Sequence, residues 1–394
     1  MPNQESKKSC KFFAPKVFIR TFGCQMNVRD SEVIAGLLTT NDYRLTTSAD
    51  KADVIILNTC SVRQHAEDKV WSEIGRFKRT QRPIIGVVGC MAQNYKDEIF
   101  QHAPNVDFVV GPSDIAKIPQ ILHKLSTIHY PLATKIWETD GGLRPEEVYH
   151  TGFYADRAHA YVVISEGCLN FCSYCVVPYV RGALRNRDYE NIIREIEEAV
   201  AKGITRITLL GQNVNAYESP GHSPQSRVSF ARLLEMVNNI PGLKEFSFVT
   251  SHPKDTTIEL FKAMQELEKL KKYLHLPVQS GSDKILKLMN RGYTRKFYLE
   301  LVENYRKIIK KGALTTDIIV GFPTETERDF QDTYDLVKDV GFAAAYIFKY
   351  SPRPHTAAAK MGDDVPQEEK ERRHALILNL QKKISKNKQC YLGF

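Results

Sequence analysis

Lys16-Val-Phe-Ile-Arg-Thr-Phe-Gly-Cys24 is a short apolar run that leads directly to a cysteine. Two later runs share this composition and also lead to a cysteine: Asp53-Val-Ile-Ile-Leu57 before Cys60, and Pro83-Ile-Ile-Gly-Val-Val88 before Cys90. Such β-branched runs predict buried strands, and the segments that follow, such as residues 31–40 and 61–80, predict helices. Strands alternating with helices predict an α/β domain with a doubly wound parallel sheet.

The three cysteines Cys24, Cys60 and Cys90 occupy equivalent positions in this pattern. In a parallel sheet the carboxyl ends of the strands share one edge, where ligands bind, so we expect the three thiols to converge there. The alternative is that each is a small buried hydrophobic residue, a common role for free cysteine. Their recurrence at strand ends favours a ligand set.

Composition restricts the class of protein. The chain has 394 residues, 42% hydrophobic and 26% charged, which excludes a disordered chain or a fibre. No apolar stretch approaches the roughly 20 residues of a membrane span, and the N-terminus lacks the apolar region of a secretion signal. We therefore expect a cytoplasmic protein without membrane contact, and a monomer. In a reducing compartment the eight cysteines favour metal or catalytic roles over disulfides, with Cys10 and Cys390 incidental.

Positive charge is concentrated in one stretch. The net charge is +9, and residues 262–311 carry 13 basic against 5 acidic side chains. One interpretation is a nucleic-acid backbone partner, and the other is a set of solvated helix faces. Charge alone does not choose between them.

A second domain follows a segment without clear periodicity. Residues 132–158 predict a linker, which places the domains at 1–150, 151–365 and, as a basic C-terminal helix, 366–394. Six further strands are predicted with enough chain between them for a crossover helix: 161–165, 206–210, 245–249, 273–278, 314–320 and 344–349. Six βα units predict a partial (β/α)6 barrel with its chemistry at the carboxyl ends of the strands.

The chemistry is indicated by Glu166-Gly-Cys168-Leu-Asn-Phe-Cys172-Ser-Tyr-Cys175, at the end of the first barrel strand. A structural zinc site wants four protein ligands, usually as two separated pairs. Three closely spaced thiols without a nearby fourth ligand fit an iron–sulfur cubane with one open iron. This Cys-x3-Cys-x2-Cys spacing resembles that of the radical S-adenosylmethionine (SAM) enzymes. The resemblance implies that SAM binds the open iron and is cleaved to a 5′-deoxyadenosyl radical.

Further motifs resemble those of the methylthiotransferases within that superfamily, over about residues 16–390. The resemblance rests on these stretches: Thr21-Phe-Gly-Cys-Gln-Met-Asn27, Asn58-Thr-Cys-Ser-Val-Arg63, Gly89-Cys-Met-Ala-Gln93, Leu210-Gly-Gln-Asn-Val-Asn-Ala-Tyr217, Ser251-His-Pro253, Leu274-His-Leu-Pro-Val-Gln-Ser-Gly-Ser282, Met289-Asn-Arg-Gly-Tyr-Thr294 and Thr316-Asp-Ile-Ile-Val-Gly-Phe-Pro323. Gln-Met-Asn after Cys24 is similar to the MiaB-type branch, the tRNA 2-methylthio-N6-isopentenyladenosine synthases.

The resemblance implies two [4Fe-4S] clusters and two uses of SAM, one as methyl donor and one as radical source. Cys168, Cys172 and Cys175 would hold the SAM-cleaving cluster, and Cys24, Cys60 and Cys90 an auxiliary cluster. The implied product is a 2-methylthio group on the isopentenylated adenosine 3′ of the anticodon in tRNA. An electron donor such as flavodoxin or ferredoxin is the other implied partner. Alternatives are a threonylcarbamoyladenosine tRNA, an aspartate of a ribosomal protein, or a non-catalytic iron–sulfur or sulfur-carrier protein.

Several polar residues near the predicted strand ends are candidates for contacting SAM; no side chain is assigned a catalytic role. The candidates are Tyr174, Gln212, Asn213, Gln279 and Ser280. For the polar ones, a hydrogen bond that only shapes a loop is the alternative. The chain departs from the family in having Thr324 and His355 where glycine is usual, and we expect it to lack the family's C-terminal TRAM β-barrel.

Overall fold

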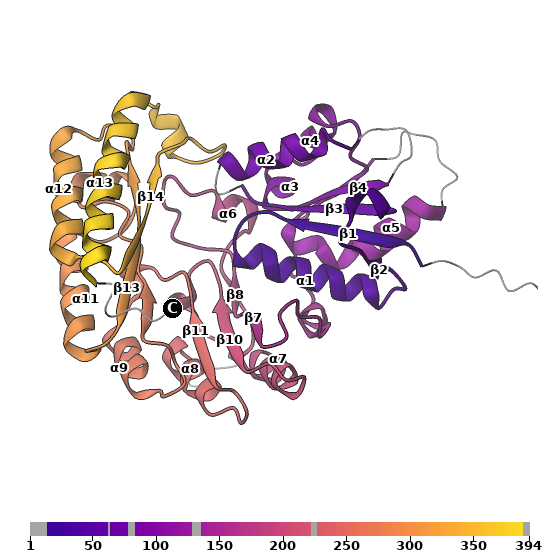
Figure 1. The fold of residues 1–394 in the computed structure, drawn as a ribbon, viewed down its shortest axis with the longest axis horizontal. Coiled ribbons are helices and arrows are strands. Elements are labelled where there is room, and N and C mark those ends of the chain that lie inside the picture. Colours follow the sequence, from indigo (N-terminus) through magenta and orange to yellow (C-terminus); the bar gives the residue numbers. More distant parts are fainter. Residues whose placement is uncertain (1–13, 62–63, 78–82, 128–134, 222–226, 389–394) are drawn as a thin grey trace, which may run out of the picture. The chain divides into compact units, whose positions relative to one another are not determined.

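The chain forms two compact units in a computed structural model that describes residues 14–61, 64–77, 83–127, 135–221 and 227–388 (Figure 1). The first unit comprises Met1–Phe22, Asp30–Thr59 and Asp68–Phe153. The second comprises Gly23–Arg29, Cys60–Glu67 and Tyr154–Phe394. Two short segments from the N-terminal part of the chain therefore belong to the second unit, and they carry Cys24 and Cys60. The incidental Cys10 and Cys390 lie outside the described residues.

The first unit is built on a parallel sheet with the order β2-β1-β3-β4-β5-β6. Its strands are β1 (Lys16–Thr21), β2 (Arg44–Leu45), β3 (Val54–Thr59), β4 (Ile84–Gly89), β5 (Phe108–Val110) and β6 (Ile136–Glu138). The three predicted strands correspond to β1, β3 and β4, and all six residues of β3 are buried, as its continuous apolar run predicts. The parallel, α/β character of this part of the chain is confirmed.

Two local predictions in the first unit were wrong. The segment read as a linker contains β6, which pairs with β5, and the 3-10 helix η3 (Glu146–His150). Three residues of strand are too few to show periodicity, so only the pairing reveals them. The first helix, α1 (Gln25–Thr39), begins directly after Cys24 rather than at Ser31.

The remaining helices of this unit are short. They are α2 (Gln64–Ile74), α3 (Cys90–Tyr95), α4 (Glu98–His102) and α5 (Ile118–Thr127), with the 3-10 helices η1 (Ala49–Lys51) and η2 (Pro112–Lys117). Helix α2 is shorter than the predicted 61–80. Cys90 is the first residue of α3, so the fold places this thiol where a strand turns into a helix.

The second unit contains the six predicted barrel strands in two parallel groups, β11-β10-β7 and β12-β13-β14. The strands are β7 (His159–Val163), β10 (Arg206–Leu210), β11 (Glu245–Phe248), β12 (Tyr273–His275), β13 (Ala313–Val320) and β14 (Ala344–Lys349). A single parallel bridge between Phe246 and Leu270 continues the pairing toward β12. The short antiparallel pair β8 (Ser165–Glu166) and β9 (Arg185–Asn186) lies outside the two groups and brackets the cysteine loop.

Helices separate these strands: α6 (Val177–Val180), α7 (Tyr189–Ala201), α8 (Phe230–Asn238), α9 (Ile258–Glu266), α10 (Asp283–Leu288), α11 (Arg295–Ile308), α12 (Glu327–Val340) and α13 (Gln367–Lys388). Most begin at a side chain that accepts an amide hydrogen bond of the first turn: Asp188, Ser229, Thr257, Ser282, Thr294 and Thr326. Each such cap contributes about 1 kcal/mol and sets where its helix starts.

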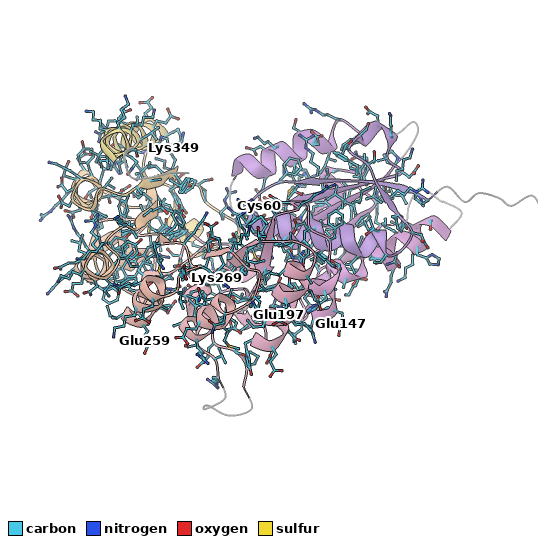
Figure 2. The ribbon with its side chains drawn as sticks, turned by 60° about the horizontal axis from the view of Figure 1, so that its bottom comes forward. Cys60, Glu147, Glu197, Glu259, Lys269 and Lys349 are labelled. Carbon is cyan, nitrogen blue, oxygen red and sulfur yellow. The ribbon has the colours of Figure 1, made fainter. Side chains whose placement is uncertain are left out.

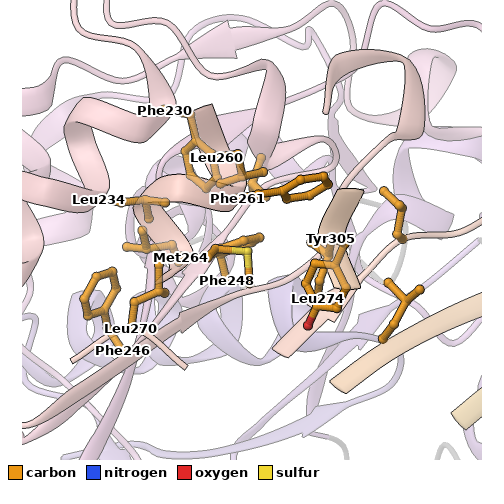
Figure 3. Packing of buried hydrophobic residues seen from close by; sticks show 14 of the residues in the cluster. Phe230, Leu234, Phe246, Phe248, Leu260, Phe261, Met264, Leu270, Leu274 and Tyr305 are labelled. Atoms are coloured by element: carbon orange, nitrogen blue, oxygen red, sulfur yellow. The ribbon is translucent and has the colours of Figure 1, made fainter. Parts of the chain in front are cut away.

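The core of the second unit is aromatic and aliphatic (Figure 3). Phe230 meets Phe248 edge-on with ring centroids 5.1 Å apart, and Phe261 meets Tyr305 at 5.6 Å. The last helix, α13, packs on β14, where Lys349 (labelled in Figure 2) pairs with Glu371 at 3.2 Å. This packing keeps the barrel strands rigid, so that loops at their carboxyl ends are held in place.

No helix within the described residues is both long and apolar enough to cross a membrane.

Candidate functional site

The loop of Cys168, Cys172 and Cys175 leaves the carboxyl end of the β7–β8 segment and ends at α6. It starts at Gly167, whose φ of +77° disfavours any residue with a side chain. A Cβ there would lie 2.1 Å from the Ala183 carbonyl oxygen. The Cys168 amide donates to the Gly182 carbonyl at 3.1 Å, so the backbone closes the loop at its base.

The middle of the loop is held by the end of α10. The Ser173 amide donates to the Met289 carbonyl (3.0 Å), and the Ser173 hydroxyl donates to the Leu288 carbonyl (2.8 Å). The Asn290 side-chain amide donates to the carbonyls of Asn170 and Phe171. These bonds join the loop to residues more than 110 positions away, and they fix its shape without a bound group.

Cys172 is the thiol with charged and aromatic neighbours. Its sulfur accepts from Arg291 Nη1 at 3.2 Å, and His252 Nε2 lies 4.0 Å away. His252 Nδ1 accepts the Lys254 amide, so the ring proton is on Nε2, facing the sulfur. Burial, together with the charge of Arg291, lowers the pKa of His252 to about 2, and this imidazole stays neutral.

Two of the three thiols have a raised pKa. Burial raises the pKa of Cys168, and burial together with the nearby Cys172 raises the pKa of Cys175 to about 12. Thiolates are the metal-binding form, so metal uptake by this loop releases protons.

Two of the five predicted SAM contacts have a buried polar atom without a partner. Asn213 Nδ2 donates to Asp255 at 2.6 Å, while its Oδ1 has no hydrogen-bond partner within the described residues. Gln279 is 7% exposed, has a φ of +73°, and its Oε1 is likewise unpartnered among those residues. An unsatisfied buried oxygen is costly, so these two positions fit a polar ligand that donates hydrogen bonds.

The other three predicted contacts are engaged with protein groups. Gln212 Oε1 accepts the Gly167 amide and so supports the cysteine loop, which is the loop-shaping alternative. Ser280 is fully buried and meets Thr333 of α12 at 3.2 Å. The Tyr174 hydroxyl accepts from Arg291 at 3.3 Å.

The donor set of this loop suits an iron–sulfur cluster better than a bare cation. Three thiols lie on one loop, Cys172 has nitrogen donors at its sulfur, and unpartnered oxygens occupy the strand ends. In the described ranges, no three His, Cys, Asp or Glu side chains are grouped closely enough to hold a metal ion as they stand. Cys168, Cys172 and Cys175 remain the predicted ligands of such a cluster.

The other cysteine triplet follows three neighbouring strands of the first sheet. Thr59 and Gly89, the residues before Cys60 and Cys90, are register partners in β3 and β4. The Phe22 amide donates to the Asn58 carbonyl at 2.7 Å, which continues the pairing of β1 with β3. A Cβ on Gly23, next to Cys24, would lie 2.5 Å from Cys60 Cβ. The strand-end placement that the sequence predicts is thus present for each cysteine.

Buried ion pairs hold the two segments that carry Cys24 and Cys60. Arg29 and Glu195 are both fully buried and 2.9 Å apart, and Glu195 also pairs with Arg187 at 2.6 Å. After Cys60, Glu67 accepts from Ser61 (2.6 Å) and pairs with Arg353 (3.4 Å). Periodicity gives no indication of these pairs, because their members are far apart in the sequence.

The basic stretch at 262–311 is not one open face. Arg291 is 4% exposed, Lys284 pairs with Asp329 at 2.9 Å, and Lys307 pairs with Glu303 at 2.7 Å. Lys269, labelled in Figure 2, donates to the Ile240 carbonyl. Counting charges along the chain therefore overstated the cationic surface available to a nucleic acid.

Arg291 is the site residue that sequence reasoning missed. Its motif, Met289-Asn-Arg-Gly-Tyr-Thr294, was noted only for its family resemblance, and its charge was counted with the surface lysines. The sequence signal is the Asn-Arg-Gly run, because Asn and Gly are typical turn residues. The structure shows both of them at positive φ, so Arg291 lies in a tight turn.

Two family profiles match successive parts of the chain. The profile described as Uncharacterized protein family UPF0004 matches residues 16–111, and the Radical SAM superfamily profile matches residues 162–337.

Similar sequences have consistent names. The chain is 45% identical over 379 residues to the tRNA-2-methylthio-N(6)-dimethylallyladenosine synthase of Moorella thermoacetica, covering 94% of this chain and 84% of that protein. It is 47% identical over 385 residues to the protein of the same name from Caldicellulosiruptor saccharolyticus, covering 95% and 80%.

Solved structures share the fold at low identity. The radical S-adenosylmethionine methyltransferase TsrM from Kitasatospora setae superposes with a TM-score of 0.59 at 13% identity, covering 88% of this chain and 77% of that chain. The cobalamin-dependent S-adenosylmethionine radical enzyme OxsB gives 0.54 at 14% identity, covering 94% and 56%. The predicted combination of a parallel-sheet domain with a radical SAM domain is confirmed.

Proposed function

This chain belongs to the radical SAM family whose curated members are the tRNA-2-methylthio-N(6)-dimethylallyladenosine synthases, and we propose that it adds a methylthio group to isopentenylated adenosine in tRNA. The observation that carries the proposal is 45–47% identity over nearly the whole chain, together with an intact Cys168-x3-Cys172-x2-Cys175 loop. The predicted family, enzyme activity and cofactor types agree with these relatives.

The reaction explains why the chain offers thiols rather than acid–base residues. Replacing an aromatic C–H by C–S requires radical chemistry that side chains cannot supply, so iron–sulfur clusters and SAM supply it. Cys168, Cys172 and Cys175 hold the SAM-cleaving cluster, and Cys24, Cys60 and Cys90 hold the auxiliary one. Asn213 and Gln279 offer their unpartnered oxygens to the amino or hydroxyl groups of SAM. Gln212 shapes the loop through the Gly167 amide.

The test is mass spectrometry of nucleosides after isopentenylated tRNA is incubated with the reconstituted, reduced protein and SAM. We expect the 2-methylthio derivative together with 5′-deoxyadenosine. Matched tRNA that lacks the isopentenyl group, or carries threonylcarbamoyladenosine, is the substrate control. 5′-Deoxyadenosine without any modified tRNA would redirect the search to a ribosomal-protein substrate. Its complete absence would favour a non-catalytic iron–sulfur protein.

We also propose an electron-donating partner and a monomeric state. An electron donor such as flavodoxin or ferredoxin reduces the cluster, and the protein acts as a cytoplasmic monomer. Light scattering of the loaded protein, alone and with tRNA, tests the monomer by its mass.

A further inference from the structure

Within the part of the chain that the structure describes, Arg291 is a buried cation without a carboxylate partner. The residue is 4% exposed, and its partners are the Cys172 sulfur (3.2 Å), the Tyr174 hydroxyl (3.3 Å), the Tyr293 hydroxyl (3.0 Å) and the Pro277 carbonyl (2.7 Å). Among the described residues no Asp or Glu forms an ion pair with it. The other buried arginines discussed above, Arg29, Arg187 and Arg353, each pair with a glutamate.

This arrangement needs an anion. A guanidinium is charged at every accessible pH, and a buried charge is stable only when it is paired and hydrogen-bonded. Hydroxyl and carbonyl groups satisfy the N–H donors of Arg291 but do not neutralise its charge. The contact that can become an anion is the sulfur of Cys172, once it is a thiolate.

The turn around Arg291 positions its guanidinium group at the sulfur of Cys172. Asn290 and Gly292 have φ of +55° and +69°, so the arginine sits between two left-handed residues. The Asn290 side chain binds the backbone of the cysteine loop, and the Tyr293 ring lies 5.4 Å from the guanidinium carbon. The turn therefore fixes the cysteine loop and the cation together.

We propose that Arg291 is the counter-ion of the cluster held by Cys168, Cys172 and Cys175, and that its hydrogen bond to the Cys172 sulfur raises the reduction potential of that cluster. The inference rests on the proposed function, because it requires the cluster. Reduction adds an electron to the cluster, and a fixed positive charge with an N–H···S bond stabilises the more negative, reduced form. Arg291 is a positioning and tuning residue in this account.

The test is a redox titration of the intact, six-cysteine holoenzyme without SAM, followed by the EPR signal that later addition of SAM perturbs. In Arg291→Gln we expect the ratio of reduced to oxidised cluster at a fixed potential to fall about tenfold, which is 59 mV for a one-electron couple. Arg291→Lys should change this ratio less, because the positive charge remains although the planar guanidinium group is lost. Arg295→Gln is the matched control, since Arg295 lies four residues away and bonds to Asp332, and no shift is expected.

Three results separate the explanations. An unchanged potential with weaker SAM binding in Arg291→Gln would overturn the proposal and make Arg291 a SAM contact. If Arg291→Gln does not fold, the reduction potential is measured in Arg291→Lys and Tyr293→Phe instead. An unchanged potential in both variants would also overturn the proposal. Failure of the wild-type protein to take up this cluster would instead defeat the proposed function.

Discussion

The two cysteine triplets reach their positions by opposite routes. Cys168, Cys172 and Cys175 lie within eight residues of one another, on one loop that backbone hydrogen bonds shape. Cys24, Cys60 and Cys90 are spread over 67 residues, and each follows a different strand. The chain's own turn brings the three thiols of the loop together, although bonds from the end of α10 also hold the loop. The other triplet needs a correctly registered sheet and buried ion pairs.

This difference implies different vulnerabilities. Ligands carried on one short loop stay near one another when distant parts of a fold loosen, whereas a ligand set assembled from distant segments is lost with the tertiary structure that aligns them. We therefore expect the SAM-cleaving site to be the more robust of the two. The predictions below test that expectation, from the largest effect to the smallest.

Replacing each triplet by alanine should separate the two activities completely. The Cys24→Ala, Cys60→Ala, Cys90→Ala protein should still cleave SAM to 5′-deoxyadenosine but add no methylthio group, because the loop of Cys168, Cys172 and Cys175 keeps all three of its own thiols. The Cys168→Ala, Cys172→Ala, Cys175→Ala protein should do neither. Nucleoside mass spectrometry and iron content are the measurements; with two four-iron clusters, each triple variant should retain about half of about eight irons. Normal methylthiolation without the first triplet would mean that sulfur enters elsewhere.

Breaking the Arg29–Glu195 ion pair should deplete the cluster of Cys24, Cys60 and Cys90 more than the other cluster. Glu195→Gln removes the carboxylate that pairs with both Arg29 and Arg187, and we expect a loss of about 3–5 kcal/mol in the free energy of unfolding. Arg29→Met should lower the free energy of unfolding less, because Arg187 and Glu195 remain paired. Among molecules that stay folded, both variants should lose auxiliary-cluster iron first. Urea denaturation measures the free energy of unfolding, and iron analysis measures cluster content. Equal loss of iron from both clusters would contradict the expected difference between the two triplets.

A glycine that precedes one cysteine in each triplet gives a residue-level version of the same test. Gly89→Ala places a Cβ 2.6 Å from the Thr59 carbonyl oxygen, and Gly167→Ala places one 2.1 Å from that of Ala183, both at positive φ. Each should cost about 2–4 kcal/mol and deplete its own cluster. Gly203→Ala is the control for backbone strain without a steric clash. Its φ is +94°, but a Cβ there would have no atom within 4 Å. Its cost should be only about 1 kcal/mol, with both clusters intact.

Asp329 offers an acid-sensitive control away from both triplets. Burial raises its pKa, but hydrogen bonds from Ser282, Thr326 and Lys284 outweigh this and hold the pKa well below its ordinary value. Its stabilisation is therefore full above about pH 5 and is lost as the pH falls below the unfolded-state value of about 3.9. We expect Asp329→Asn to destabilise the apoprotein by roughly 2 kcal/mol at pH 7, and the difference from wild type to shrink at pH 3. A constant difference across this range in urea denaturation would contradict the assignment, and the variant should load both clusters at pH 7.

The smallest effect concerns a departure from the family pattern. Thr324 and His355 stand where the family usually has glycine, and their φ values are +66° and +67°. Thr324 is exposed, so its side chain gains little from packing. Thr324→Gly should raise the free energy of unfolding by about 1 kcal/mol by relieving backbone strain. A measurement of the free energy of unfolding is sufficient. A lower value for the variant than for the wild type would show that the hydroxyl or methyl group stabilises this turn.

Much of the fold was predictable because its signals are local. Apolar runs located β1, β3, β4 and all six barrel strands, and the cysteine spacing located the loop of Cys168, Cys172 and Cys175. The linker prediction failed because β6 has three residues and becomes a strand only by pairing with β5. The α1 start was misplaced because apolar periodicity begins several residues into the helix.

The candidate SAM contacts show where sequence reasoning stops. Gln212, Asn213, Gln279 and Ser280 all follow barrel strands, and nothing in their spacing distinguishes them. The structure leaves oxygens of Asn213 and Gln279 unpartnered within the described residues, and it turns Gln212 to Gly167 and Ser280 to Thr333. A side chain's direction depends on backbone conformation and on neighbours from distant segments.

The sequence by itself determined the alternation of strands and helices, the six cysteines and the family, since each is written in short-range patterns. Tertiary structure alone decided which charges are buried and against what. Arg291 counts as one cation among the 13 basic residues of the stretch 262–311, yet folding places it against the sulfur of Cys172, 119 residues away. The physical reason is that burial and pairing of a charge depend on packing between distant segments, which no local pattern records.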